Sequence, residues 1–244
     1  MTDERNPAWA PVTRSRAHEL VIQAIEDQIM SGALAVGDPL PPERELASRL
    51  EVSRAGVREA VRVLEGQGVL RSRVGSGAEA GTFIAALPDA ALTRFLRLHV
   101  ALANYPLADV VDARVTLERS SASFAARNAG AAALAPIRAA LDRGAAADVS
   151  PAEFNDADTA FHVAIAEAGG NRLVASMTVA IRESLSARIL DALADHPDWA
   201  GLAAQLHAQH VELFDAIARH DPDAAAALAE EHIRFAGQEL PQVR

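Results

Sequence analysis

The chain has 244 residues, a formal net charge of −10 and a hydrophobic content of 50%. This length suits two domains with separate cores, and the absence of cysteine excludes disulfide bonds and thiolate metal sites. No segment approaches the ~20 consecutive apolar residues of a membrane-spanning helix, and the N-terminal residues lack the apolar core of a signal peptide, so a soluble, cytoplasmic protein without a membrane partner is expected.

The N-terminal residues divide into an arm and a first helix. Residues 1–12 are expected to form a disordered arm. A helix is predicted over 13–30, because Val21 and Ile25 recur at helical spacing and Gly32 follows its end.

Residues 41–66 predict two short amphipathic helices joined by a tight turn at Glu51-Val52-Ser53. Ser53 is a suitable N-cap for the second helix. That helix places aliphatic side chains on one face and a basic ridge on another: Val57, Val61 and Leu64; Arg54, Arg58 and Arg62. The pattern is typical of a helix-turn-helix, whose second helix enters the major groove of DNA.

A β-hairpin is predicted to follow. Residues 69–73 alternate like a strand, glycines interrupt the chain, and residues 82–84 can return as the second strand. Arg71 and Arg73 would then lie on a wing, positioned for DNA phosphates. The alternative is a plain helical hairpin with a solvated arginine face.

The distribution of charge agrees with DNA binding despite the acidic total. Residues 44–73 contain seven arginines and four glutamates, a net charge of +3, whereas residues 85–244 have a net charge of −8. A basic region of this kind is the electrostatic signature of a nucleic-acid contact.

The remainder of the chain predicts only helices. A linker is expected at 85–90, and residues 91–240 are alanine-rich and helix-periodic. Breaks near 128–130, 150–151, 169–171, 196–197 and 221–222 divide them into six or seven helices. The predicted fold is therefore mostly α: a winged helix-turn-helix at 13–84, then an all-α antiparallel helical bundle.

Four polar residues fall on apolar faces of these helices. Asp158 and His162 are one turn apart beside phenylalanines, and His210 and His232 lie in apolar stripes of two later helices. His207 lies at the edge of the same stripe as His210, so His210 is preferred. Imidazoles and a carboxylate suit zinc, and also nickel, manganese or iron. The alternative is that these are structural core histidines.

The N-terminal pattern resembles the winged helix of GntR-type bacterial regulators. The resemblance rests on Pro-Glu-Arg-Glu-Leu-Ala, Val-Ser-Arg, Val-Arg-Glu-Ala-Val and Gly-Thr-Phe. It implies that Arg44, Arg54, Arg58 and Gly75 contact operator DNA. Ser53, Arg71 and Arg73 complete the predicted DNA-binding set. The sequence departs from the family pattern at two places. Residues 78–80 are extra residues in the wing. Gly56 lies in the recognition helix, where it either allows close approach to the bases or is simply tolerated.

The C-terminal residues resemble the FCD ligand-binding domain of the FadR-type branch of that family. The resemblance implies a metal held by Asp158, His162, His210 and His232, and a small carboxylate effector. Arg114 would bind the effector's carboxylate, unless it is an exposed partner of Glu118. Asn171 is implied at the effector site, or serves only as a helix cap.

The predicted function is therefore a homodimeric, effector-responsive repressor of a short palindromic operator in double-stranded DNA, and not an enzyme. One alternative is a regulator for which the metal itself is the signal. Another is a metalloenzyme fused to a DNA-binding domain, against which the sequence offers no additional general base or nucleophile.

Overall fold

A computed structural model describes residues 17–75, 80–85, 89–145 and 148–240. The chain divides into two compact units, with the boundary between Ala91 and Leu92. The predicted arm at 1–12, half of the linker at 85–90 (residues 86–88) and the wing residues 76–79 lie outside the described residues. Within the described residues no helix is long and apolar enough to cross a lipid bilayer.

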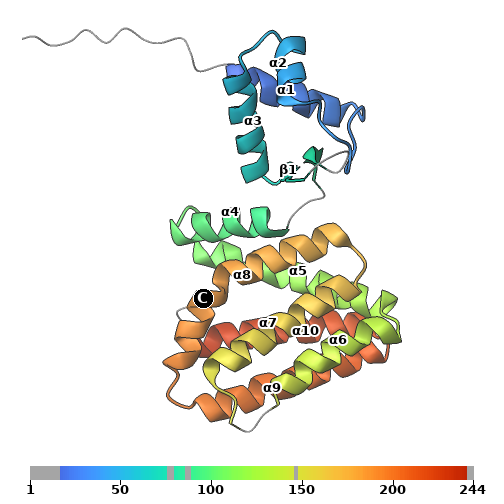
Figure 1. The fold of residues 1–244 in the computed structure, drawn as a ribbon. Coiled ribbons are helices and arrows are strands. Elements are labelled where there is room, and N and C mark those ends of the chain that lie inside the picture. The colour runs from blue at the N-terminus through green and yellow to red at the C-terminus, as the bar shows by residue number, and fades with distance from the viewer. Residues whose placement is uncertain (1–16, 76–79, 86–88, 146–147, 241–244) are drawn as a thin grey trace, which may run out of the picture. The chain divides into compact units, whose positions relative to one another are not determined.

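The N-terminal unit consists of three helices and a two-stranded hairpin (Figure 1). Its elements are α1 (Ala17–Met30), α2 (Glu43–Arg49), α3 (Arg54–Gly66), β1 (Leu70–Arg73) and β2 (Gly81–Ile84). Val21 and Ile25 of α1 pack against Val57 and Leu64 of α3 in one apolar core. The apolar residues that recur at helical spacing in the sequence therefore lie on the buried face of each helix.

The turn between α2 and α3 is built by a left-handed residue and a cap. Glu51 has a φ of 53°, which reverses the chain direction within a few residues. The hydroxyl of Ser53 then accepts a hydrogen bond of 3.1 Å from the N–H of Gly56 and caps α3. Such a cap is worth about 1 kcal/mol.

The hairpin is antiparallel, and Leu70 pairs with Ile84 while Arg73 pairs with Gly81. Leu70 and Ile84 are buried against the helices, whereas Arg71 and Arg73 are exposed. The predicted wing is therefore present in the structure.

The C-terminal unit contains seven helices among its described residues. They are α4 (Asp89–Ala101), α5 (Leu107–Asn128), α6 (Ala131–Arg143), α7 (Pro151–Ala168), α8 (Arg172–Ala194), α9 (Trp199–Ala218) and α10 (Pro222–Glu239). Helix α5 packs against α7, α8 and α10, and α6 packs against α7 (Figure 1). The predicted fold class, a winged helix-turn-helix followed by an all-α bundle, is confirmed.

Side-chain caps define the starts of four helices of this bundle. Ser150 and Glu153 form a reciprocal capping box at the start of α7. Asn171, Asp198 and Asp221 each accept a hydrogen bond from a backbone N–H at the start of α8, α9 and α10. The predicted breaks at these places correspond to real helix ends.

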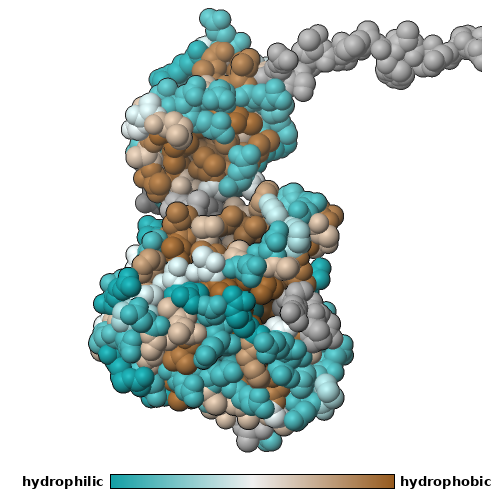
Figure 2. Space-filling view, turned by 180° about the vertical axis from the view of Figure 1, so that it is seen from behind, coloured by the Kyte–Doolittle hydropathy of each residue, from teal (hydrophilic) through white to brown (hydrophobic). Residues whose placement is uncertain are grey.

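The surface of the C-terminal unit is not uniformly polar. Apolar surface shows as brown areas among teal ones in Figure 2. On α4, Phe95 and Leu98 are each 50% exposed, and Leu102, which directly follows the helix, is 69% exposed. This helix therefore leaves part of its apolar side chains outside the core of its own chain.

Candidate metal centre and DNA-binding surface

The DNA-binding residues predicted on the helices lie on the surface of the N-terminal unit. Arg44, Arg54 and Arg58 are exposed, and Arg54 is the first residue of α3. Arg58 donates hydrogen bonds of 3.2 and 3.3 Å to a carboxylate oxygen of Glu43. Exposed ion pairs of this kind contribute little stability, so the guanidinium of Arg58 can exchange this partner for DNA.

Gly56 is explained by packing within the protein. A Cβ atom added to Gly56 would lie 3.1 Å from the Cβ of Ala17, which is tighter than ordinary van der Waals contact. The glycine thus allows α1 to pass close to the first turn of α3. Of the two explanations that the sequence left open, close approach to bases or simple tolerance, neither included this contact with α1.

The wing presents two further cations. Arg71 and Arg73 project from alternate positions of β1, and the guanidinium of Arg73 lies 5.1 Å from the centre of the Phe83 ring. This cation–π contact gives Arg73 a preferred orientation. Gly75 follows at the exposed end of the hairpin.

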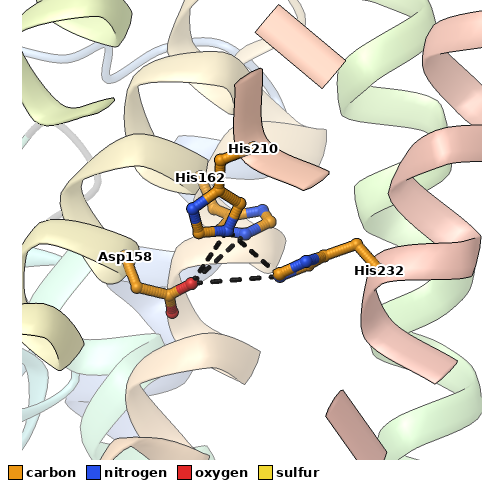
Figure 3. Close-up of side chains that lie close together, drawn as sticks. All are labelled: Asp158, His162, His210 and His232. Atoms are coloured by element: carbon orange, nitrogen blue, oxygen red, sulfur yellow. Dashed lines mark hydrogen bonds and ion pairs between the residues drawn. The ribbon is translucent and has the colours of Figure 1, made fainter. Parts of the chain in front are cut away.

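In the C-terminal unit the four predicted metal ligands converge from three helices. Asp158 and His162 belong to α7, His210 to α9 and His232 to α10. One potential ligand atom of each lies within 4.8 Å of the other three (Figure 3). All four side chains are buried, so the cluster forms an enclosed centre within the bundle.

The three imidazoles of the cluster lie around a single carboxylate oxygen. Asp158 Oδ1 lies 3.2 Å from His210 Nε2, 3.6 Å from His162 Nε2 and 3.9 Å from His232 Nε2. His210 Nε2 and His232 Nε2 are 3.2 Å apart. All three imidazoles therefore present the same ring nitrogen to the same small volume (Figure 3).

Other side chains hold two of these imidazoles from behind. His162 contacts Glu118 Oε2 through Nδ1, and His232 Nδ1 is 2.9 Å from the Gln209 amide oxygen. The ring of His210 packs between Phe161 and Phe154, with ring centres 4.6 and 6.2 Å away. Partners that fix the second ring nitrogen are typical of metal-binding histidines.

A buried ionic network surrounds the cluster. Glu118 Oε1 accepts hydrogen bonds of 2.7 Å from Arg114 Nε and 2.9 Å from Arg182 Nη1. Arg182 also donates to Asp158 Oδ2. Two carboxylates are thus matched by two guanidinium groups, which makes burial of four charges tolerable.

Neither Glu118 nor Arg182 was predicted as a site residue, and Gln209 was also missed. A signal for Arg182 was present in the sequence. Arg182 follows Ala180 and Ile181 and precedes Leu185, all of them buried, so it interrupts an apolar face of α8. A charged residue in that position is expected to have a buried partner.

The network determines which groups carry charge. Burial by itself raises the pKa values of Glu118 and Asp158, but Arg182 and the adjacent histidines hold both pKa values well below the ordinary range. Burial lowers the pKa of His210 to about 4 and that of His232 well below its usual value. At neutral pH both carboxylates are therefore ionised, and His210 and His232 are neutral.

These states fit a divalent transition metal. Metal-binding imidazoles must be neutral and carboxylates ionised. Among the described residues, the buried His162 Nε2 has no hydrogen-bond partner, which is uncommon for a buried polar atom. A metal held by His162, His210, His232 and Asp158 would give that nitrogen a partner.

The lowered pKa of His210 predicts acid sensitivity of the metal-free protein. Its value is about 4 in the fold against an ordinary 6.5, so the unfolded chain binds more protons between these pH values. Stability must then fall as pH decreases through this window, by about 2 kcal/mol between pH 7 and pH 5 from His210 alone. His232 acts in the same direction. Urea unfolding followed by Trp199 fluorescence measures the effect, and equal unfolding free energies at the two pH values would contradict it.

A small cavity adjoins the cluster. Its volume is about 30 Å³, and its lining includes Arg114, Asp158, His232 and apolar side chains such as Phe154 and Leu206. Arg114 is only 5% exposed. Arg114 is therefore the partner of Glu118 that the sequence offered as the alternative, but the pair is buried beside the predicted metal ligands rather than exposed.

Two other predicted positions lie elsewhere. Asn171 is exposed at the start of α8, where its side chain caps the helix, and it does not belong to the lining of this cavity. His207 lines a different cavity with Trp199 and Gly144. Of the two histidines weighed on α9, His210 is the one that joins the cluster.

Comparison with known proteins agrees with both halves of this description. Residues 17–79 match the family described as bacterial regulatory proteins, gntR family, and residues 109–235 match the FCD domain. The chain is 31% identical to the HTH-type transcriptional repressor NanR of Cronobacter sakazakii, in an alignment that covers 91% of this chain and 85% of that protein. It is 27% identical to the Glc operon transcriptional activator of Escherichia coli strain K12, covering 100% and 92%.

Solved structures show the same fold. A Streptococcus agalactiae GntR structure superposes with a TM-score of 0.58 at 24% identity, covering 91% of this chain and 99% of that one. E. coli McbR/YncC gives a TM-score of 0.50 at 18% identity, covering 93% and 97%.

Proposed function

Because this chain belongs to the GntR family of transcriptional regulators and carries an FCD domain, we propose that it is a repressor controlled by a small carboxylate bound at a metal centre. The observation that carries this proposal is the convergence of three imidazole nitrogens and one carboxylate oxygen in a buried cluster. That cluster borders a cavity which Arg114 also lines.

The metal would be held by Asp158, His162, His210 and His232, and zinc suits this donor set best. Nickel, manganese and iron also accept imidazole and carboxylate ligands. The bound cation would supply positive charge that attracts an anionic group. Arg114 would contribute a second positive charge beside it, as guanidinium groups recognise carboxylates well.

The DNA-binding part of the proposal rests on α3 and the wing. Arg44, Arg54 and Arg58, with Ser53 at the start of α3, would contact the operator, and Arg58 would approach base edges in the major groove. Arg71, Arg73 and Gly75 would follow the sugar–phosphate backbone. A protein of this kind acts in the cytoplasm, where the bacterial chromosome lies.

The active form would be a homodimer on a short palindromic operator. Two copies are needed to contact two half-sites with the same helix. The exposed Phe95 and Leu98 of α4, with Leu102 just after it, support association, because apolar patches on a soluble protein often mark contact surfaces.

Control by an effector requires unequal binding to two arrangements of the dimer. We propose that the effector relieves repression. In support, the chain is 31% identical to NanR of Cronobacter sakazakii, which is a transcriptional repressor. Asn171, which caps α8, is proposed to take part in effector binding through a rearrangement of the α7–α8 connection.

Elemental analysis of the purified protein, paired with a thermal-shift screen of small carboxylic acids, tests the proposal. We expect about one transition metal per chain, one site being formed by the four residues of the cluster. One class of acid should raise the melting temperature only when the metal is present. Metal-free protein with no response to any acid would leave the histidines as core residues and refute the effector site.

The small cavity volume of about 30 Å³ favours a second candidate, a regulator for which the metal itself is the signal. Dialysis against a chelator separates the two. Metal that is retained through dialysis, with DNA binding that still depends on an acid, supports the first proposal. Metal that is lost easily and whose loss alone changes DNA binding supports the second.

A further inference from the structure

Glu118 contacts three polar side chains beside the predicted metal cluster, Arg114, His162 and Arg182, although it is not one of the predicted ligands. It lies on α5 and is 3% exposed. Both of its carboxylate oxygens are in use, and they serve different partners. This division determines what Glu118 can do to the neighbouring His162.

One oxygen is committed to guanidinium groups. Oε1 accepts from Arg114 Nε at 2.7 Å and from Arg182 Nη1 at 2.9 Å. Arg182 is itself fixed by its second contact, with Asp158 Oδ2. Because guanidinium nitrogens can only donate, the atom facing these two arginines must be an acceptor.

The other oxygen faces His162. Oε2 contacts Nδ1 of that ring, and an ionised carboxylate can only accept a hydrogen bond. Nδ1 must therefore carry a proton. In the neutral ring, Nε2 is then left with its lone pair, and that atom is 3.6 Å from Asp158 Oδ1 within the cluster.

We propose that Glu118 is a positioning residue that sets the tautomer of His162, so that Nε2 is available as a metal ligand; its role toward a metal rests on the function proposed above. The two arginines are part of the device because they fix which carboxylate oxygen faces the ring. His232 is held more simply, by the Gln209 amide oxygen at 2.9 Å from its Nδ1.

The arginines make Glu118→Gln an informative substitution. The amide oxygen must occupy the place of Oε1, since an NH₂ group there would face two other donors. The NH₂ group is then directed at His162 Nδ1 and donates to it. The proton of the neutral ring consequently moves to Nε2, where it blocks the ligand position.

The tautomer can be measured without any metal. Long-range ¹H–¹⁵N correlation spectra of the metal-free full-length protein, labelled with ¹⁵N-histidine, distinguish the two neutral tautomers. A His162→Asn sample assigns the signal among the eight histidines. Zinc affinity is then measured in competition with a chelator of known affinity.

Glu230→Gln is the matched control. Glu230 also accepts from two arginines, Arg119 and Arg234, but it lies outside the metal cluster. This variant makes the same chemical change in a carboxylate that also faces two arginines, but in a partly exposed ion pair. Circular dichroism spectra establish that both variants remain folded.

In the wild type we expect His162 with its proton on Nδ1, and in Glu118→Gln with its proton on Nε2. Zinc affinity should fall about 10- to 100-fold in Glu118→Gln, as for other partners of metal-binding histidines, and stay unchanged in Glu230→Gln. A wild-type His162 protonated on Nε2 would overturn the proposal even if Glu118→Gln did not fold. An unchanged tautomer in Glu118→Gln would overturn it as well.

The same experiment separates this proposal from the metal site itself. If the tautomer switches as described but wild-type protein binds no zinc, Glu118 does set the tautomer of His162, and it is the metal-dependent function that fails.

Discussion

His210→Ala is expected to abolish stoichiometric metal binding and, with it, the response to a carboxylate effector. His210 Nε2 is the imidazole nitrogen nearest to Asp158 Oδ1, at 3.2 Å, and it is also 3.2 Å from His232 Nε2. Its removal takes one of four ligand atoms from the cluster. The loss of affinity should exceed the 10- to 100-fold typical of groups that only support a ligand. Metal per chain after dialysis measures it.

His207→Ala is the natural control for this substitution. His207 belongs to the same helix, α9, but lines a separate cavity with Trp199. The substitution His207→Ala removes the same kind of side chain as His210→Ala. We expect this variant to keep its metal and its melting-temperature response to the effector. Metal content that is unchanged in His210→Ala, or lost in His207→Ala, would show that the cluster is not the metal site.

The substitution at His210 also has a cost in stability that must be separated from metal loss. The ring is 3% exposed and packs on Phe161 and Phe154. Large-to-small changes at buried sites cost about 2–5 kcal/mol. The DNA-binding unit has its own apolar core, so we expect operator binding by that unit to persist. Unfolding of the metal-free proteins, followed by circular dichroism, measures the loss of stability separately from the loss of metal.

Much of the fold was predictable because its boundaries are encoded locally. Ser150 and Pro151 at the start of α7 act within one turn of the helix, as do Asp221 and Pro222 at the start of α10. The pair of Asp158 and His162 was equally accessible, because residues four apart on a helix share a face. Residues on one element could thus be assigned to a common side from spacing alone.

The ionic network could not be derived in that way. Glu118 and Arg182 are 64 positions apart, and nothing in the spacing of either helix indicates that α5 and α8 bring them together. Arg114 illustrates the difficulty: an Arg–Glu pair at i,i+4 is ordinarily a solvated surface pair, yet here both side chains are buried. Its position depends on the tertiary packing of α5 against α8 and α10.

The break between α4 and α5 was also missed. Ala103 adopts a left-handed φ of 54° there, a conformation that glycine or asparagine would have signalled and that alanine does not. In the N-terminal unit the sequence left the reason for Gly56 open, since its neighbour Ala17 lies in another helix. Both cases depend on contacts that become visible only once the helices are assembled.

Arg58→Ala is expected to weaken operator binding about 10- to 100-fold and to relax base preference at the position it contacts, as the loss of a bidentate base contact costs about 1–3 kcal/mol. Arg58 is 58% exposed and, within the part of the chain that the structure describes, pairs with Glu43 alone in an exposed pair, so the variant should remain folded. Fluorescence anisotropy with the operator and with single-base variants of it measures both effects.

Arg62→Ala provides the comparison that separates base contact from general charge. Arg62 lies one turn further along α3, is 68% exposed and pairs with Glu59, so its removal changes the net charge of the unit by the same amount. Because base contacts come from the N-terminal part of a recognition helix, Arg62→Ala should weaken binding modestly and equally for all sequences. If Arg58→Ala binds the operator as tightly as the wild type, or if Arg62→Ala loses more base preference than Arg58→Ala, α3 is not oriented on DNA in this way.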